Sequence, residues 1–195
     1  MNPEKQALTA LEFQPLTPER WPDLERLFGE HGAYGGCWCM WWRITRSQFS
    51  KQQGEGNRQA LHEIVASGEV PGILAYVEGE PVGWCSVAPR DSYPSLNRSR
   101  VLKKLDNTPV WSIVCFYVDK GHRSQGLTLD LIRAAIEYVR GQGGRVIEAY
   151  PTQPKGERLP PVSSYMGLPS LFEQAGFVEC RRPSQSKVIM RYYIE

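Results

Sequence analysis

The feature that most constrains this fold is a buried strand that runs, through a short glycine-containing loop, into an amphipathic helix. Residues 110–118 (VWSIVCFYV) are almost continuously apolar, as in a strand covered on both faces. After the loop, apolar residues recur four apart at Leu127, Leu131, Ala135 and Val139, which predicts a helix. Glycines at 141, 143 and 144 end that helix, and residues 145–149 predict another strand. This β-loop-α-β order indicates an α/β protein.

Strand and helix patterns also flank this unit. Strands are predicted over residues 8–13, 72–77, 82–87, 176–180 and 187–194, and helices over 18–28 (behind a Thr17 cap), 57–67 and 168–174. Residues 78–81 (EGEP) form the turn of a hairpin. Residues 89–109 and 151–161 are predicted as loops, and the first is long enough to suggest a function. No repeat or linker divides the chain, so we expect one domain over residues 1–195.

Composition narrows the class of function. The chain is 41% hydrophobic and 23% charged, which favours a packed core over intrinsic disorder. Its 23 Lys and Arg against 21 Asp and Glu leave a net charge of +2, far less than duplex nucleic acid usually demands. No apolar run approaches the ~18–20 residues of a membrane span, and the first ten residues lack a secretion signal. We therefore expect a cytoplasmic protein with no nucleic-acid and no membrane partner.

The loop after the central strand has the composition of an anion site. Residues 119–128 (DKGHRSQGLT) lead into a helix, where backbone N–H groups and the helix start favour a pyrophosphate. Arg123 would add a full charge, although a plain turn with a solvated arginine explains the same residues. Nucleotide motifs are absent: there is no GxxxxGK[ST], and Gly141 to Gly143 follow a helix instead of preceding one.

This loop resembles the acetyl-CoA motif of the GCN5-related N-acetyltransferase (GNAT) family, Arg/Gln-x-x-Gly-x-Gly/Ala. Arg123, Gly126 and Thr128 occupy its positions, with Thr128 in place of the usual small residue. Residues 171–177 (LFEQAGF) are similar to the family's later Leu-Tyr-Glu-Lys-x-Gly-Phe segment, and the order of elements matches over essentially the whole chain.

The resemblance implies a mixed, mostly antiparallel central sheet, splayed at its middle and flanked by helices. It implies transfer of acetyl from acetyl-CoA to a primary amine of a small molecule or peptide, by direct attack in a ternary complex; a homodimer is one possible assembly. The implied cofactor-binding residues are Phe116, Tyr117, Val118, Arg123, Ser124, Gln125, Gly126, Leu127 and Thr128. The alternative is a CoA-binding regulatory module without catalysis.

Two residues are candidates for proton transfer. Many relatives protonate the leaving thiolate with a tyrosine, but Phe172 stands at that position. Tyr165, seven residues earlier, is our candidate acid, with packing on the nearby prolines as the alternative. Glu148, in an otherwise apolar strand, is the candidate base because burial raises a carboxyl pKa; a solvent-facing strand end and catalysis by water are the alternatives.

The acceptor is left open by two conflicting sequence features. Trp38, Trp41 and Trp42, three of the six tryptophans, form either an acceptor pocket for an apolar or cationic group or part of the core. Three arginines in the 89–109 loop (Arg90, Arg98 and Arg100) favour an anionic acceptor instead. Cys37 and Cys39 lack the second paired motif of a zinc site, so no metal site is expected, and a metal or redox sensor is the weaker alternative.

Overall fold

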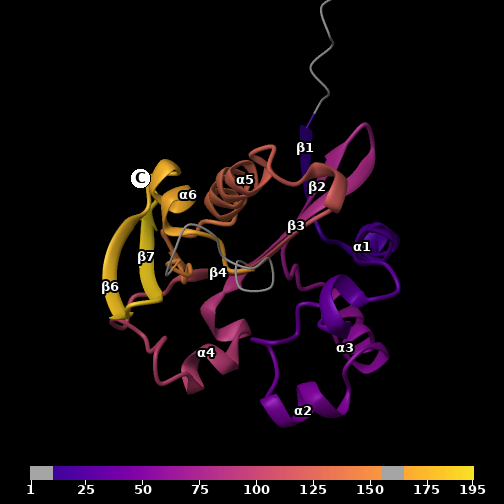
Figure 1. The fold of residues 1–195 in the computed structure, drawn as a ribbon, viewed down its shortest axis with the longest axis horizontal. Helices are drawn as coiled ribbons and strands as arrows, with labels where there is room; N and C mark the ends of the chain where they lie inside the picture. The colour runs from indigo at the N-terminus through magenta and orange to yellow at the C-terminus, as the bar shows by residue number, and fades with distance from the viewer. Residues whose placement is uncertain (1–10, 155–164) are drawn as a thin grey trace, which may run out of the picture.

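A computed structural model describes residues 11–154 and 165–195. Its seven strands form one sheet in the order β1-β2-β3-β4-β5-β7-β6 (Figure 1). The strands are β1 Leu11–Pro15, β2 Ile73–Val77, β3 Glu80–Pro89, β4 Trp111–Val118, β5 Val146–Ala149, β6 Val178–Ser184 and β7 Lys187–Tyr193. The helices are α1 Trp21–Phe28, α2 Arg46–Lys51, α3 Glu55–Ala66, α4 Pro94–Arg98, α5 Leu127–Gly141 and α6 Pro169–Gln174.

The sheet opens at its middle. Every neighbouring pair of strands is antiparallel except β4 and β5, which run parallel. The β4–β5 ladder spans only Trp111–Ile113 against Ile147–Ala149, whereas β4 continues for five more residues to Val118. The expected mixed, mostly antiparallel and splayed sheet is therefore confirmed.

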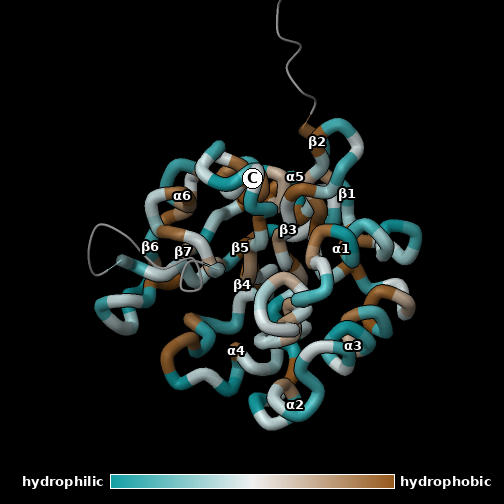
Figure 2. Tube along the Cα trace, turned by 45° about the vertical axis from the view of Figure 1, so that its right-hand side comes forward, coloured by the Kyte–Doolittle hydropathy of each residue, from teal (hydrophilic) through white to brown (hydrophobic). Residues whose placement is uncertain are grey.

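Helices cover both faces of the sheet. Figure 1 shows α5 and α6 on one side and α1, α2, α3 and α4 on the other. One core lies under α5, where Leu131, Ile132 and Ala135 are fully buried against strand residues such as Ile113. A second joins α1 and α3 to the opposite face, and a third gathers around Tyr93, Leu96 and Tyr150. Figure 2 shows hydrophobic segments along the central strands and hydrophilic ones in the outer turns.

Short elements differ most from the prediction. Helix α2 was not predicted, because it buries only Phe49 and therefore has no apolar periodicity; a capping box between Thr45 and Gln48 begins it instead. The predicted 89–109 loop contains α4 and a 3-10 turn at Arg90–Ser92. The predicted helix 18–28 is divided into a 3-10 turn, Pro18–Arg20, and α1, and the Thr17 side chain makes no cap. Residues 8–10 of the predicted first strand and 155–161 of the predicted loop lie outside the described residues.

No helix among the described residues is both long and apolar enough to cross a membrane.

Candidate active site

Backbone N–H groups of β4 point alternately toward β3 and away from it, and those that point away define the open edge of the strand. Asp119 donates its N–H to the carbonyl of Val82 on β3 at 2.9 Å. Because successive strand residues point their N–H groups to opposite sides, Phe116 and Val118 direct theirs away from β3. The N–H of Phe116 donates to the carbonyl oxygen of Tyr165 at 2.6 Å, and the carbonyl of Val118 accepts from Nε of Arg123 at 3.0 Å. The far half of β4 therefore faces the opening of the sheet.

A segment beginning at Tyr165 occupies part of that opening. Thr152, just beyond β5, donates its N–H to the carbonyl of Gly167 at 3.1 Å, so residues 165–167 contact both sides of the gap. Gly167 has φ +81°, and a Cβ there would lie 2.8 Å from the Phe172 ring and 3.3 Å from the Phe116 ring. Only glycine fits this close approach. The Phe116 N–H, which we expected to bind the cofactor, is already engaged, and Val118 carries the next N–H along the same edge.

The loop between β4 and α5 is held by its own polar groups. Asp119 Oδ2 accepts from the N–H of Gly121 at 2.8 Å, and this hydrogen bond holds the pKa of Asp119 below its usual value. Gln125 Nε2 donates to the carbonyl of Gly121 at 2.9 Å. Ser124 and Gly126 both have positive φ, +61° and +86°. The loop is therefore ordered by contacts that leave its outer face exposed.

The space in front of α5 suits a pyrophosphate. Gly126 caps α5 without a side chain, and nothing lies within 4 Å of where its Cβ would be. At the start of this 15-residue helix, the N–H groups of Leu129 and Asp130 donate to the carbonyl of Gly126 at 2.8 and 3.3 Å. The N–H groups before them, together with the helix dipole, favour an anion. Arg123, Ser124, Gln125 and Gly126 are exposed and Thr128 is half-buried, so the residues present fit the group.

The remaining predicted cofactor residues lie on both faces of β4. Phe116 is buried on the α5 side, 6.1 Å from the ring of Phe172. Tyr117 packs on the opposite side, 5.5 Å from the ring of Phe28. Leu127, the first residue of α5, is buried in the core beneath that helix. Residues 116–128 thus run from the open edge of β4 through the loop to the start of α5. The side chains of Phe116 and Leu127 are buried in the core, and those of the loop residues 123–125 are exposed.

Tyr165 lies on the side of the sheet opposite α5. Its half-buried side chain packs against the core that contains Trp42, Val114 and Met166. Burial raises the pKa of Tyr165 above its usual value, although the charge of Arg46 opposes the shift. The phenol is protonated at neutral pH, as a proton donor must be, and would be so even at its usual pKa of about 10.

Glu148 is held in a buried ion-pair network. The side chain is 1% exposed; Oε1 accepts from Arg90 Nη1 at 2.6 Å and from the Tyr150 hydroxyl at 2.7 Å. Oε2 accepts from Arg191 Nε at 2.9 Å, and Arg191 also pairs with Asp106 at 2.6 Å. Both carboxylate oxygens are therefore hydrogen-bonded, and the side chain is buried, not solvent-facing as the alternative had it.

The network removes Arg90 from the candidate acceptor residues. Arg90 is 3% exposed and also donates to the carbonyl of Leu102 at 2.6 Å. It therefore fastens the 89–109 loop to β5, and the expectation that it faces an anionic acceptor is wrong. No local pattern could predict this pairing, because 58 residues separate Arg90 from Glu148.

The three clustered tryptophans are divided between different environments. Trp38 is 5% exposed and stacks on Trp21 at 6.0 Å between ring centroids, and Trp42 is 7% exposed in the core around Tyr93. Both are mainly core residues, which agrees with the alternative interpretation that the cluster is part of the core. Trp41 is half-buried, and the guanidinium of Arg46 lies over its ring, with Cζ 3.1 Å from the centroid.

Cys39 and Cys115 lie in or against the core that also contains Trp38. Cys39 is buried, and its Sγ accepts from Nε1 of Trp84 at 3.3 Å. A hydrogen bond from Cys115 is the main cause that lowers the pKa of Cys39 to about 7, against the effect of burial. Within residues 11–154 and 165–195, no three His, Cys, Asp or Glu side chains are placed to hold a metal ion.

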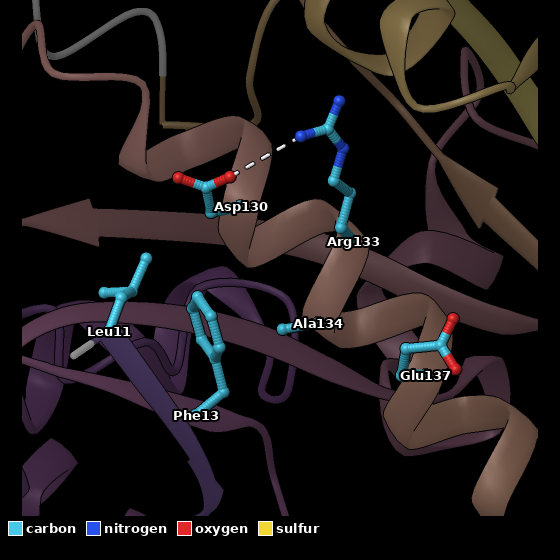
Figure 3. A pocket seen from close by; sticks show the side chains of 6 residues that line it. All are labelled: Leu11, Phe13, Asp130, Arg133, Ala134 and Glu137. Carbon is cyan, nitrogen blue, oxygen red and sulfur yellow. Dashed lines mark ion pairs between the residues drawn. The ribbon is translucent and has the colours of Figure 1, made fainter. Parts of the chain in front are cut away.

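A shallow hollow lies elsewhere, between β1 and α5. Figure 3 shows its lining: Leu11, Phe13, Asp130, Arg133, Ala134 and Glu137, with Asp130 and Arg133 paired at 3.7 Å. None of the predicted site residues lines it.

Comparison with known proteins identifies the family. The model of the acetyltransferase (GNAT) family matches residues 38–158, which include β4, the loop and α5. A search of curated proteins gives no match.

Solved structures share the fold. The PaiA N-acetyltransferase of Thermoplasma acidophilum, in complex with coenzyme A, is 13% identical with a TM-score of 0.54, covering 95% of this chain and 99% of its own. A GNAT acetyltransferase of Streptococcus agalactiae 2603 is 14% identical with a TM-score of 0.56, covering 95% and 96%. One from Streptococcus pneumoniae is 12% identical with a TM-score of 0.55, covering 95% and 100%. Because the family model matches more than half of the sequence, the chain belongs to the GNAT family of acetyl-CoA-dependent N-acetyltransferases.

Proposed function

We propose that this chain transfers acetyl from acetyl-CoA to a primary amine of a small molecule or peptide, by direct attack while both substrates are bound. The observation that carries the proposal is the opening of the sheet beyond Ile113, where β4 continues alone toward the start of α5. A pantetheine arm laid along this edge would have its pyrophosphate at the α5 N-terminus. Acetyl-CoA supplies the activated thioester, and the chain supplies position and protons.

Binding depends on the 123–128 loop. The exposed main chain of Ser124, Gly126 and the first turn of α5 would donate to the pyrophosphate. Arg123 already donates Nε to Val118, so its two terminal nitrogens would extend toward the phosphates with the side chain held at its base. Thr128 adds a hydroxyl that can donate to a phosphate oxygen.

Catalysis needs a polarised thioester carbonyl and a proton for the leaving thiolate. The N–H of Val118, the next one along the open edge after Phe116, would polarise the carbonyl. Tyr165 would donate the proton, because a tyrosine phenol is protonated at neutral pH and the main chain of Tyr165 is fixed to β4 at Phe116. With both oxygens of Glu148 engaged, the proton released by the amine would pass to water.

Release of free thiol from acetyl-CoA, measured against a panel of amines, tests the proposal. We expect thiol release that depends on the amine, together with an acetylated product detected by mass spectrometry. Binding of acetyl-CoA with only slow hydrolysis, the same with every amine, would favour a CoA-binding regulatory module instead.

A further inference from the structure

The half-buried ring of Trp41, one of the tryptophans expected to receive an acceptor, is covered by a cation of the chain itself. Arg46 lies over Trp41 with Cζ 3.1 Å from the ring centroid, and its Cζ is 5.5 Å from the centroid of Trp42. An aromatic ring attracts cations through the negative potential of its face. Because Arg46 occupies that face of Trp41, the ring is not open on that side to a cationic substrate.

Arg46 itself has unused hydrogen-bonding capacity. It is exposed at the first position of α2, and the first turn of that helix contains no acidic residue. Among the described residues, its guanidinium makes no hydrogen bond and no ion pair, whereas nearby Arg43 is buried and pairs with Glu69 at 3.3 Å. A guanidinium presents five N–H donors in a planar fork that matches an oxyanion.

The position of Arg46 connects it to the site proposed above. Its positive charge lowers the pKa of Tyr165, against the larger effect of burial. Tyr165 is fixed by its carbonyl to Phe116 on the open edge of β4. Trp41 and Tyr165 pack against the same core. Arg46, Trp41 and Tyr165 therefore form one wall on the face of the sheet opposite α5.

We propose that Arg46, held over the ring of Trp41, binds an oxyanion of the acceptor, so that the substrate amine also carries a carboxylate or a phosphate. The contact with the ring restrains the guanidinium, and its N–H groups can make a forked contact with a carboxylate or a phosphate. A polyamine or another purely cationic acceptor would be repelled by the same charge. The inference rests on the proposed function, since it assigns the acceptor side of that site.

Conjugates that join CoA to an acceptor can test this without turnover. Each probe links the CoA sulfur through –CH₂–CO–NH– to an alkyl spacer that ends in a carboxylate, a phosphate or an uncharged amide, at two spacer lengths. The dissociation constants are measured by titration calorimetry for the parent, Arg46→Gln and Arg46→Lys. Arg133→Gln, at an exposed residue of α5 that pairs with Asp130, is the matched control.

The expected result is that an anionic conjugate binds the parent about tenfold more tightly than its amide, as one charged contact would give. Arg46→Gln should reduce that ratio to about one, Arg46→Lys should keep part of it, and Arg133→Gln should keep all of it. A preference for carboxylate over phosphate, or the reverse, identifies the anion. Melting temperatures check that each variant folds.

Equal binding of anionic and amide conjugates, or a preference that persists in Arg46→Gln, would overturn the inference. So would a failure of every conjugate to bind a protein that binds acetyl-CoA, because the acceptor side would then not accept these groups. If neither the conjugates nor acetyl-CoA bind, the proposed function fails, and the assignment of Arg46 fails with it.

Discussion

The N–H of Phe116 donates a 2.6 Å hydrogen bond to the carbonyl oxygen of Tyr165. Two segments about 50 residues apart in sequence are thereby joined at the point where the sheet opens. One is the strand that would carry the pantetheine, and the other supplies the phenol. A proton donor is effective only when it is held within hydrogen-bond reach of the leaving atom, and this backbone contact fixes the main chain of Tyr165 beside β4.

Replacement of Tyr165 by phenylalanine should lower kcat by roughly 10²- to 10⁴-fold, the usual effect of losing a general acid. The affinity for acetyl-CoA should change little, because the carbonyl that bonds Phe116 remains. Steady-state kinetics and calorimetry measure the two quantities. Tyr193→Phe, at a tyrosine that is 54% exposed on β7, is the control. An unchanged kcat in Tyr165→Phe, where chemistry limits the rate, would assign the proton to water or another group.

Placing a tyrosine at position 172 should not create a second acid. Phe172 is fully buried, and its ring edge already lies against Gly167 and Phe116. Phe172→Tyr would bury a hydroxyl without a partner and should reduce the free energy of unfolding by about 1–3 kcal/mol. Urea denaturation measures this. A variant as stable as the parent, with a higher kcat or with rescue of Tyr165→Phe, would show that the hydroxyl reaches the thiol after all.

The ion-pair network of Glu148 should contribute chiefly to the stability of the folded protein, and less to kcat. Glu148→Gln removes the charge between Arg90 and Arg191, both nearly buried, and breaking a buried ion pair costs about 3–5 kcal/mol. Denaturant unfolding should show this loss, whereas Glu137→Gln, at an exposed pair with Arg140, should change stability by less than about 0.5 kcal/mol. Full stability with a collapse of kcat at all amine concentrations would instead restore Glu148 as the base.

The ion pair between Asp106 and Arg191 should make the stability of the protein depend on pH in the acid range. The Arg191 side chain holds the pKa of Asp106 well below its usual range. A lowered folded pKa stabilises the protein above the unfolded value, about 3.9, and this contribution is lost as the pH falls toward the folded value. The difference in melting temperature between parent and Asp106→Asn should thus be largest above about pH 5 and shrink below about pH 4. A difference that stays constant from pH 7 to 3 would contradict this role.

Sequence predicted the centre of this fold well, because long elements there carry strong local patterns. Strand β4 is a continuous apolar run, and α5 repeats its buried residues at helical spacing over 15 residues. Gly126 in a left-handed conformation immediately before α5 agrees with the predicted loop. Helix α2 escaped prediction because its cap, not its apolar residues, defines it.

The site could be predicted only where it is local in sequence. Residues 116–128 are contiguous, so a motif could indicate them. The partners of Glu148 and Arg191 lie 58 and 85 residues away, and no pattern in the sequence relates them. Nor could sequence separate Trp41 from Trp38 and Trp42, although Arg46, only five residues from Trp41, was a local sign of the cation that covers it.

The most direct test of the account is amide hydrogen exchange with and without acetyl-CoA. If the cofactor lies along the open edge of β4 with its pyrophosphate at the start of α5, acetyl-CoA should slow exchange at Val118 and over residues 124–129. Exchange in α3, Glu55–Ala66, should not change. Binding that slows exchange only outside residues 116–129, or slows it nowhere, would contradict the account.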